Sequence, residues 1–568
     1  MEKHAKKITP IQRFWLLLKP DSRDIRNVYV YSIFNGLVNL SLPLGIQAIV
    51  NLIQGGQVST SWIVLVSFVV AGVAISGIMS IFQLRITENL QQKIFARAAF
   101  EFADRIPRIK MEALYKHYPP ELMNRFFDVM HVQKGLSKIL IDFSSAALQV
   151  IFGLILLSLY HPFFILFSLI LVSLVYAIFR FTVKRGLSTS LEESKHKYKL
   201  VHWLEEVART STTFKLAGKS DLPLRRTDKH VTDYVNAREG HFSVLVRQYS
   251  LLVGFKVLVA TGLLAIGGIL VMEQHMNIGQ FVAAEIIILL IMGSVEKLIL
   301  NLETIYDILT SLEKVGQVTD LELEEYDSAT INPDRIDEGV EVELKGVSFT
   351  YPDHDRKTLN NLDLKIEAGE RLFLSGSNGS GKSTLLYITS ALYNVQKGSI
   401  HFNGIPKKNL NLGQLRSLIG DCLTQEQLFH GTIMENICMG KEKANFENVK
   451  WAVENLGLDR FISDLNDGYE TMLDPEGKRL PRSIVQKLLL ARCIVDRPKL
   501  IILEDPLEHI DENEKHKIID FLTASENKWT MIAVSSDRYF AERCDRIALM
   551  QEGQITATGS FENMKNNI

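Results

Sequence analysis

The chain has 568 residues, which is enough for more than one domain. Its composition is 47% hydrophobic with a formal net charge of −2, so it lacks the basic excess of nucleic-acid-binding proteins, and we expect no nucleic-acid partner. Four cysteines without a C-x-x-C spacing argue against a disulfide framework and against a zinc site. The basic start is not followed at once by a short apolar core with a cleavage site, so we expect no signal peptide.

Six apolar segments lie in the first 300 residues or so, and each is long enough to cross a bilayer, which takes roughly 20 residues per helix. They are residues 28–53, 62–84, 140–160, 162–182, 250–272 and 279–300. The connections after the first, third and fifth segments are short and contain no Lys or Arg, whereas those after the second and fourth are long and basic. The positive-inside tendency therefore predicts a multi-pass protein of the inner (plasma) membrane, with both termini and both long loops in the cytosol. A soluble enzyme with six core helices would not require this asymmetry.

Each long connection is predicted to be a helical hairpin that projects into the cytosol and returns. A short turn is expected near residues 105–122 and another near residues 209–223, with a solvated loop as the alternative in both places. Lys256 and Glu296 are expected near the cytosolic ends of their spans, where long side chains reach the interface. Glu285 lies deeper and is a candidate to line a substrate path.

An acidic, polar stretch at residues 316–340 separates the apolar half from a second domain and reads as a linker. Two segments follow it, "VEVELKGVSFTY" and "LDLKIEAGERLFLSG", whose alternation predicts strands. The second strand leads directly into "GSNGSGKST" and an apolar helix. This is the G-x-x-x-x-G-K-[ST] phosphate loop, from Gly376 to Ser383, in the strand–loop–helix setting that the motif requires.

The residue types of this loop suit a nucleotide triphosphate with magnesium. Glycines let backbone amides converge on the phosphates at a helix N-terminus, the lysine adds positive charge, and the serine hydroxyl can bind Mg²⁺. The sequence therefore predicts ATP and Mg²⁺ as cofactors. The predicted phosphate-binding residues are Gly376, Ser377, Asn378, Gly379, Ser380, Gly381, Lys382, Ser383 and Thr384.

With six spans, two long hairpins and one phosphate-loop domain, the chain resembles the ATP-binding cassette (ABC) exporters, in their half-transporter layout and over almost its whole length. The resemblance implies a membrane all-α six-helix domain followed by an α/β P-loop NTPase domain. It implies that Tyr351 in "VSFTYPD" stacks on adenine, and that Gln425 in "LTQEQLFHGTIMENI" senses the γ-phosphate and contacts the metal. The wording around "NIGQFVAAEII" looks most like bacterial type I secretion exporters, which implies a periplasmic adaptor as a further partner.

This reading divides the chain into four parts. They are a cytosolic N-terminal segment (1–27), a transmembrane domain (28–315), a linker (316–340) and an ATP-binding cassette domain (341–568).

The chain departs from the family pattern at the signature, which is "LSGGQ" in the family and "LPRSI" at residues 480–484 here. In the family this segment grips the γ-phosphate bound by the other subunit, which places Arg482 and Ser483 beside that nucleotide. Pro481 has no N–H to donate, and Arg482 stands where a small residue would let the backbone approach. Arg482 either supplies a compensating charge or bonds to solvent or a nearby acid.

Two further departures affect hydrolysis. The family ends a buried strand in Asp-Glu, whereas this chain has Glu504 and Asp505. The resemblance makes Glu504 a metal ligand, with Ser383 and Gln425, and makes Asp505 a water-positioning base that is one methylene short. Ser536 stands where the family has its switch histidine, and Ser cannot carry the positive charge. The implied catalytic residues are therefore Asp505, Gln425 and Ser536.

The leading hypothesis is an ATP-binding transport subunit that exports a substrate by alternating access, as a homodimer or as a heterodimer with a second exporter half, and that hydrolyses ATP slowly. The alternative is a non-hydrolysing, ATP-binding membrane subunit that regulates or scaffolds a transporter complex.

Overall fold

The computed structural model describes residues 8–54, 60–326, 338–424, 426–441 and 443–565. The chain forms two compact units, unit 1 with residues 1–107 and 117–321, and unit 2 with residues 108–116 and 322–568. The short piece 108–116 interrupts the first long hairpin in sequence but packs within unit 2. There the amide of Lys110 donates to the carbonyl of Glu322 at 2.9 Å, and the amide of Glu324 donates to the carbonyl of Arg108 at 2.7 Å.

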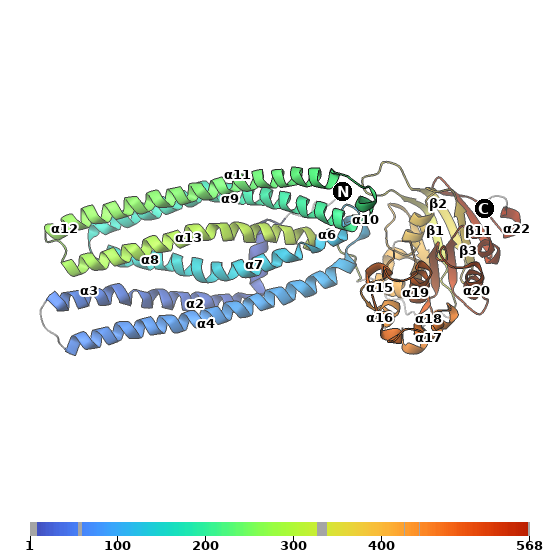
Figure 1. Cartoon of the computed structure of the whole chain (residues 1–568), viewed down its shortest axis with the longest axis horizontal. Helices are drawn as coiled ribbons and strands as arrows, with labels where there is room; N and C mark the ends of the chain where they lie inside the picture. The colour runs from blue at the N-terminus through green and yellow to red at the C-terminus, as the bar shows by residue number, and fades with distance from the viewer. Residues whose placement is uncertain (1–7, 55–59, 327–337, 425, 442, 566–568) are drawn as a thin grey trace. The chain divides into compact units, whose positions relative to one another are not determined.

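The described residues of unit 1 are helical apart from short turns, and its long helices run side by side (Figure 1). The N-terminal helices are α1 (Pro10–Leu18), α2 (Ser22–Asn39), α3 (Ser41–Gln54), α4 (Thr60–Arg105), α6 (Pro119–Met123), α7 (Phe126–Lys138) and α8 (Ser144–Ser158). The remaining ones are α9 (Pro162–Arg209), α10 (Ser211–Leu216), α11 (Leu222–Gly262), α12 (Gly268–Met272) and α13 (Ile278–Thr319). Short 3-10 turns at Lys19–Asp21 and Ile106–Arg108, and π-helical segments at Ile139–Phe143 and Leu263–Gly267, connect some of them.

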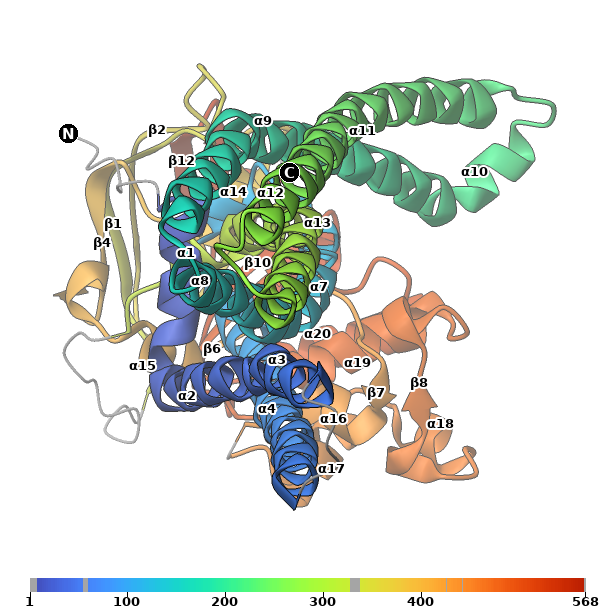
Figure 2. The ribbon, with the colours of Figure 1, turned by 90° about the vertical axis from the view of Figure 1, so that its left-hand side faces the viewer.

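Six helical stretches are long and apolar enough to cross a membrane, which confirms the six predicted spans. Each contains 40 to 51 residues, about twice what a bilayer requires. The excess length of α4, α9 and α11 forms the two predicted helical hairpins. The short turns expected in them are also present, as α5 (Met111–Leu114) and α6 in the first and α10 in the second. Figure 2 shows α10 at the tip of the α9–α11 pair, which projects away from the other helices of unit 1.

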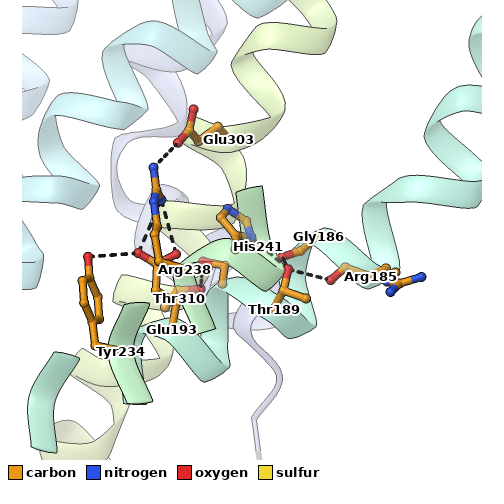
Figure 3. A network of polar contacts seen from close by, with 10 residues as sticks. Arg185, Gly186, Thr189, Glu193, Tyr234, Arg238, His241, Glu303 and Thr310 are labelled. Atoms are coloured by element: carbon orange, nitrogen blue, oxygen red, sulfur yellow. Dashed lines mark hydrogen bonds and ion pairs between the residues drawn. The ribbon is translucent and has the colours of Figure 1, made fainter. Parts of the chain in front are cut away.

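Helix α13 is the most buried helix of unit 1 and packs against α7, α8, α3 and α9. Where it meets the α9–α11 pair, the contacts become polar (Figure 3). The Arg238 guanidinium of α11 lies 3.3 Å from Glu193 on α9 and 3.6 Å from Glu303 on α13. Close by, the hydroxyls of Ser190 and Thr310 are 2.9 Å apart. Such side-chain bonds tie three helices together in the part of the hairpin that extends beyond an apolar span.

The two charged residues expected at span ends bind each other. Lys256 on α11 lies 2.7 Å from Glu296 on α13, so an ion pair accounts for both. Glu285 is half-buried in α13, and its assignment to a substrate path stays a prediction.

Unit 2 contains two main sheets. A four-stranded antiparallel sheet has the order β2-β1-β4-β5, and a six-stranded sheet has the order β12-β11-β3-β10-β9-β6, parallel except for β12. The strands of the first are β1 (Val342–Phe349), β2 (Leu359–Ile366), β4 (Lys397–Phe402) and β5 (Ile405–Pro406). Those of the second are β3 (Arg371–Gly376), β6 (Ile419–Cys422), β9 (Leu500–Glu504), β10 (Thr530–Val534), β11 (Arg546–Gln551) and β12 (Gln554–Gly559). A small pair, β7 (Gly431–Thr432) and β8 (Met472–Leu473), lies apart from them.

The main helices of unit 2 are α14 (Lys382–Thr389), α15 (Leu412–Ser417), α16 (Ile433–Cys438), α17 (Phe446–Asn455), α18 (Asp459–Ser463), α19 (Arg482–Ile494), α20 (Glu512–Leu522), α21 (Arg538–Arg543) and α22 (Phe561–Met564). Two apolar clusters are buried against the six-stranded sheet, one formed with helices that include α16, α17, α19 and α20, and the other formed with α14, α15 and the four-stranded sheet. Strands β9 and β10 are buried at every position, which is why they read as continuous apolar runs in the sequence. The alternation of strands and helices confirms the predicted α/β phosphate-loop fold.

Close packing at Gly186 gives a test of the unit 1 fold. A Cβ atom at this position would lie 2.4 Å from the buried ring of Tyr306, whose hydroxyl accepts a bond from Gln248 at 2.7 Å. We expect Gly186→Ala to destabilise the protein by about 1–3 kcal/mol through overpacking, seen as a lower midpoint of thermal unfolding in detergent. Gly240→Ala is the matched control, because a Cβ there meets no atom within 4 Å. An unfolding midpoint for Gly186→Ala at or above that of Gly240→Ala would contradict this packing.

Candidate functional site

Four neighbouring parallel strands of unit 2 end at one edge of the sheet, and their exits carry the predicted site. In the order β3-β10-β9-β6, these strands lead into Gly376, Val534, Glu504 and Cys422. The register pairs Val534 with Glu504, and Cys422 with Leu503, so the exits are level with one another. Ligands of such sheets bind outside the carboxyl ends of the strands. The sheet therefore brings the phosphate loop, the acid pair and Ser536 together.

The phosphate loop leaves β3 and enters α14 through three glycines that need their conformational freedom. Gly376, Gly379 and Gly381 have φ angles of 151°, 79° and 104°. A Cβ at Gly376 would lie 2.2 Å from the carbonyl oxygen of Met550, and one at Gly381 would lie 2.9 Å from that of Thr358. The loop is thus held close to neighbouring backbone, with its amides at the start of a helix.

Lys382 is the first residue of α14, and its ammonium reaches back across the loop. Its Nζ donates to the carbonyls of Gly376 at 2.7 Å and Ser377 at 3.0 Å. Burial lowers the pKa of this ammonium, whereas the charges of Asp505 and Glu504 act in the opposite direction. The hydroxyl of Ser380 is buried in the same loop without a hydrogen-bond partner. The loop therefore has the form of an anion cradle, with a cation and an unsatisfied polar group on it.

The other predicted phosphate-loop residues take three positions. Ser377 and Asn378 are exposed at the top of the loop, Ser383 is exposed in the first turn of α14, and Thr384 is buried. The Oγ1 of Thr384 lies 3.0 Å from the hydroxyl of Tyr351, which connects the predicted adenine-stacking ring to the loop.

Tyr351 follows β1 and lies within an aromatic cluster. Its ring makes edge contacts with Phe349 and Tyr393 at centroid distances of 5.0 and 5.6 Å, and it stacks on Tyr115 at 5.3 Å. The hydroxyl of Tyr115 also lies 2.9 Å from Nε2 of His354. Sequence reasoning missed Tyr115, because nothing local relates it to a residue 236 positions further along the chain.

The acid pair occupies two different environments at the end of β9. Glu504 is buried, and its Oε2 accepts from the hydroxyl of Thr424 at 2.6 Å. Asp505 adopts a left-handed conformation with φ 46°, and its amide donates to the carbonyl of Val534 at 2.8 Å. The pKa of Asp505 is raised by burial and by the charges of Glu504 and Glu508, although Lys382 and the amide of Ser536 favour its ionised form. A raised pKa suits a general base, and Ser536 engages this acid through its backbone.

The altered signature begins α19, but with Pro481 as the N-cap residue just outside the helix. Arg482 is exposed, and its Nη1 lies 3.3 Å from Nε2 of His509. The amide of His509 in turn donates to Oε1 of Gln486 at 3.0 Å. Within the described residues, His509 is therefore the hydrogen-bond partner of the Arg482 guanidinium, and the alternatives left open for Arg482 stay predictions. Ser483 is half-buried in the first turn of the helix.

A cavity of about 620 Å³ connects the acid pair with the start of α19. Its walls include Glu504, Asp505, Arg482, Glu508 and His509. Sequence reasoning missed Glu508 and His509, although the run "EHID" offered a signal, since it places two titratable residues three and four positions after Asp505. Gln425 lies outside the described residues, so its predicted role stays a prediction.

The residues present fit a magnesium ion that is held mainly by a nucleotide. Among the described residues, no group of three or more His, Cys, Asp or Glu side chains could hold a metal by itself. Mg²⁺ at nucleotide sites usually takes one or two protein oxygens, several waters and phosphate oxygens. The Ser383 hydroxyl and the Glu504 carboxylate are oxygen donors of this kind.

Comparisons with known proteins agree with this geometry. The ABC transporter transmembrane region model matches residues 26–295, and the ABC transporter model matches residues 359–508. An ATP-dependent lipid A-core flippase from Chromobacterium violaceum is 32% identical over 216 residues, which cover 38% of this chain and 37% of that protein. A leukotoxin translocation ATP-binding protein, LktB, from Mannheimia glucosida is 26% identical over 342 residues, or 60% of this chain and 48% of the relative.

These alignments span less than half of the length of the curated relatives. A solved structure extends the likeness in fold: a bacterial Atm1-family ABC exporter with ATP bound superposes with a TM-score of 0.80 at 16% identity, over 96% of both chains. The two family models together match well over half of the chain and name the same family. The chain belongs to the ABC transporter family, with an ABC transporter transmembrane region fused to an ABC transporter ATP-binding domain.

Proposed function

We propose that this chain is one half of an ATP-driven exporter that binds MgATP, dimerises, and hydrolyses ATP slowly. The observation that carries the proposal is the phosphate loop at the edge of the six-stranded sheet, in the same chain as six membrane-spanning helices. Lys382 and the loop amides would hold the phosphates, Ser383, Glu504 and Gln425 the magnesium, and Tyr351 the adenine. Asp505 would position the attacking water, assisted by Gln425 and Ser536. The division at residues 27, 315 and 340 belongs to the same proposal.

Dimerisation follows from the position of the altered signature. In the exporters that the chain resembles, the segment at this position grips the nucleotide bound by the other subunit, so Arg482 and Ser483 at the start of α19 would do the same here. In a homodimer, each composite site would combine the altered signature, acid pair and switch. In a heterodimer, one site would contain this chain's acid pair and switch, and the other its signature. A periplasmic adaptor is a further proposed partner, supported by the likeness to a leukotoxin translocation protein.

The second candidate is a regulatory subunit that binds ATP without hydrolysing it. The contact between Arg482 and His509 favours it, because a signature arginine that bonds within its own chain is less available to a partner's phosphate. ATP turnover by the purified protein separates the two candidates. Turnover above that of a Lys382→Ala variant supports the exporter, whereas saturable binding without turnover supports the regulatory subunit.

Nucleotide binding can be tested at both ends of the site. Lys382→Ala should weaken MgATP binding about 10–100-fold, because the phosphates lose a charge-assisted contact. Tyr351→Ala should weaken it less, about 2–10-fold, through lost stacking on the base. Equilibrium binding of a fluorescent ATP analogue measures both. Lys517→Ala, at an exposed lysine of α20, is the control. Equal affinities for Lys382→Ala and Lys517→Ala would show that the loop is not the site.

Repair of the altered motifs tests the assignment of catalytic roles. The unmodified protein should turn over at least about ten-fold more slowly than a standard exporter, which is about 1.4 kcal/mol of barrier. Asp505→Glu alone should give only a modest gain, because residues that act as a unit are strongly non-additive. Asp505→Glu, Ser536→His and a restored "LSGGQ" should together raise turnover beyond the product of the single gains. Steady-state ATPase assays measure this, and vigorous, vanadate-sensitive activity of the unmodified chain would refute the roles.

The proposed location is the inner (plasma) membrane, with both termini and both hairpins in the cytosol. Gly56→Cys and Gln274→Cys, in the connections after the first and fifth spans, should react with a membrane-impermeant maleimide in intact cells. Lys219→Cys, exposed beside α10, should react only after permeabilisation. The reverse pattern would overturn the proposed orientation.

A further inference from the structure

The strongest unassigned feature of unit 1 is an apolar cavity of about 880 Å³ beside α1. Its walls come from α1, the start of α2 and the π-helical segment Ile139–Phe143. Phe14, Trp15, Leu16 and Ile139 contribute apolar surface, and Trp15 remains 64% exposed. An exposed tryptophan next to other large apolar side chains is typical of a surface that meets the interfacial region of a bilayer.

Helix α1 is fixed in place on its other side, so the cavity is a built feature and not the gap beside a loose terminus. Nη1 of Arg13 donates to Asp320 at 2.7 Å, and its Nε lies 3.7 Å from Glu313. Leu18 is buried among residues of α2, α4 and α7. A Thr9 capping box begins the helix. With one side anchored, α1 presents Trp15 and Leu16 as the wall of the cavity.

Near the cavity, the acidic side chains are bound in ion pairs, whereas two basic side chains line the cavity. The two acids of this segment are paired with α4, Asp21 with Arg97 and Asp24 with Lys93, each at 2.7 Å. Lys19 and Arg26 instead line the cavity. Within the described part of the chain, neither of them has an acidic partner.

Three of the polar residues at the cavity lie close together in the sequence. Ser22 and Arg26 are four residues apart on α2, which places them on the same side of that helix, and Lys19 precedes them in the 3-10 turn Lys19–Asp21. An apolar chamber with two unpaired cations and a hydroxyl at its rim suits a ligand that is apolar at one end and anionic at the other. The π-helical floor adds a local widening of the helix, a feature that is frequent at functional sites.

We propose that this cavity binds one anionic phospholipid, with its acyl chains against Trp15, Leu16 and Ile139 and its phosphate between Lys19 and Arg26. Basic pockets between membrane helices recognise anionic head groups in this way. A zwitterionic lipid brings its own ammonium group and gains less from two cations. A protein segment without acids would leave both cations unpaired. The proposal is independent of ATP hydrolysis and of what the chain transports.

The test uses the whole chain in lipid nanodiscs and reads the fluorescence of Trp15 by difference from Trp15→Phe. Bromine on lipid acyl chains quenches nearby tryptophans. With two cations near the head group, brominated phosphatidylglycerol should therefore quench Trp15 at least about ten-fold more effectively than brominated phosphatidylcholine at the same fraction. Lys19→Gln and Arg26→Gln should each reduce this preference about five-fold, as expected for one cation near an anionic head group. Lys19→Arg with Arg26→Lys should retain it, which controls for folding.

Arg23→Gln is the matched control for general surface attraction, because Arg23 lies on the same helix and is exposed but does not line the cavity. It should change the preference less than two-fold. A loss with Arg23→Gln as large as with Arg26→Gln would overturn the proposal in favour of diffuse attraction. Equal quenching by the two brominated lipids would overturn it as well. Absence of quenching by either lipid would mean that a protein segment covers the cavity, and would also refute it.

Discussion

The parallel order of four strands in unit 2 is the constraint on which the nucleotide site depends. Because β3, β10, β9 and β6 run in the same direction with their ends in register, everything that follows them in sequence meets at one edge. Residues from four separate parts of the chain thus become neighbours without direct bonds between all of them. The effect appears in the charges: Lys382, Glu504 and Asp505 influence one another although 122 residues separate the lysine from the first acid.

The end of β9 at this edge also explains why the exchange of the family's Asp-Glu pair for Glu504 and Asp505 should affect hydrolysis. Glu504 is buried at the end of β9 and engaged by Thr424, the residue just before Gln425, whereas Asp505 turns out of the strand in a left-handed conformation. The two carboxylates therefore have different roles open to them because of their backbone positions, and a change in side-chain length affects each role differently. Asp505 has an elevated pKa that suits a base but a reach one methylene shorter than glutamate.

In unit 1, the long helices contact one another through polar side chains in the parts that extend beyond the apolar spans. The helices are about twice as long as a bilayer requires, and the α9–α11–α13 junction is held by Arg238, Glu193 and Glu303. Near α1, Asp21 and Asp24 form ion pairs with basic residues of α4, whereas Lys19 and Arg26 line an apolar cavity. The ion pairs of Arg238 hold helices of the protein together. The charges of Lys19 and Arg26 instead remain available to the anionic ligand that we propose.

Sequence by itself determined the six spans, the two hairpins and the phosphate loop, because each is a local signal. Span length follows from a run of apolar residues, and the loop follows from glycine spacing between a strand and a helix. The division into an all-α and an α/β part follows from the same periodicities. The apolar run before Glu504 likewise predicted a buried strand, and β9 is buried at every position.

Only the tertiary structure decided which distant residues share a site. It placed Tyr115 on Tyr351, His509 beside Arg482, and Glu296 beside Lys256, and it opened the cavity between α1 and Ile139–Phe143. These contacts arise from chain segments that are far apart or that differ in periodicity, so no local pattern records them. A side chain's partner is set by how whole elements pack, and that is a property of the folded chain as a whole.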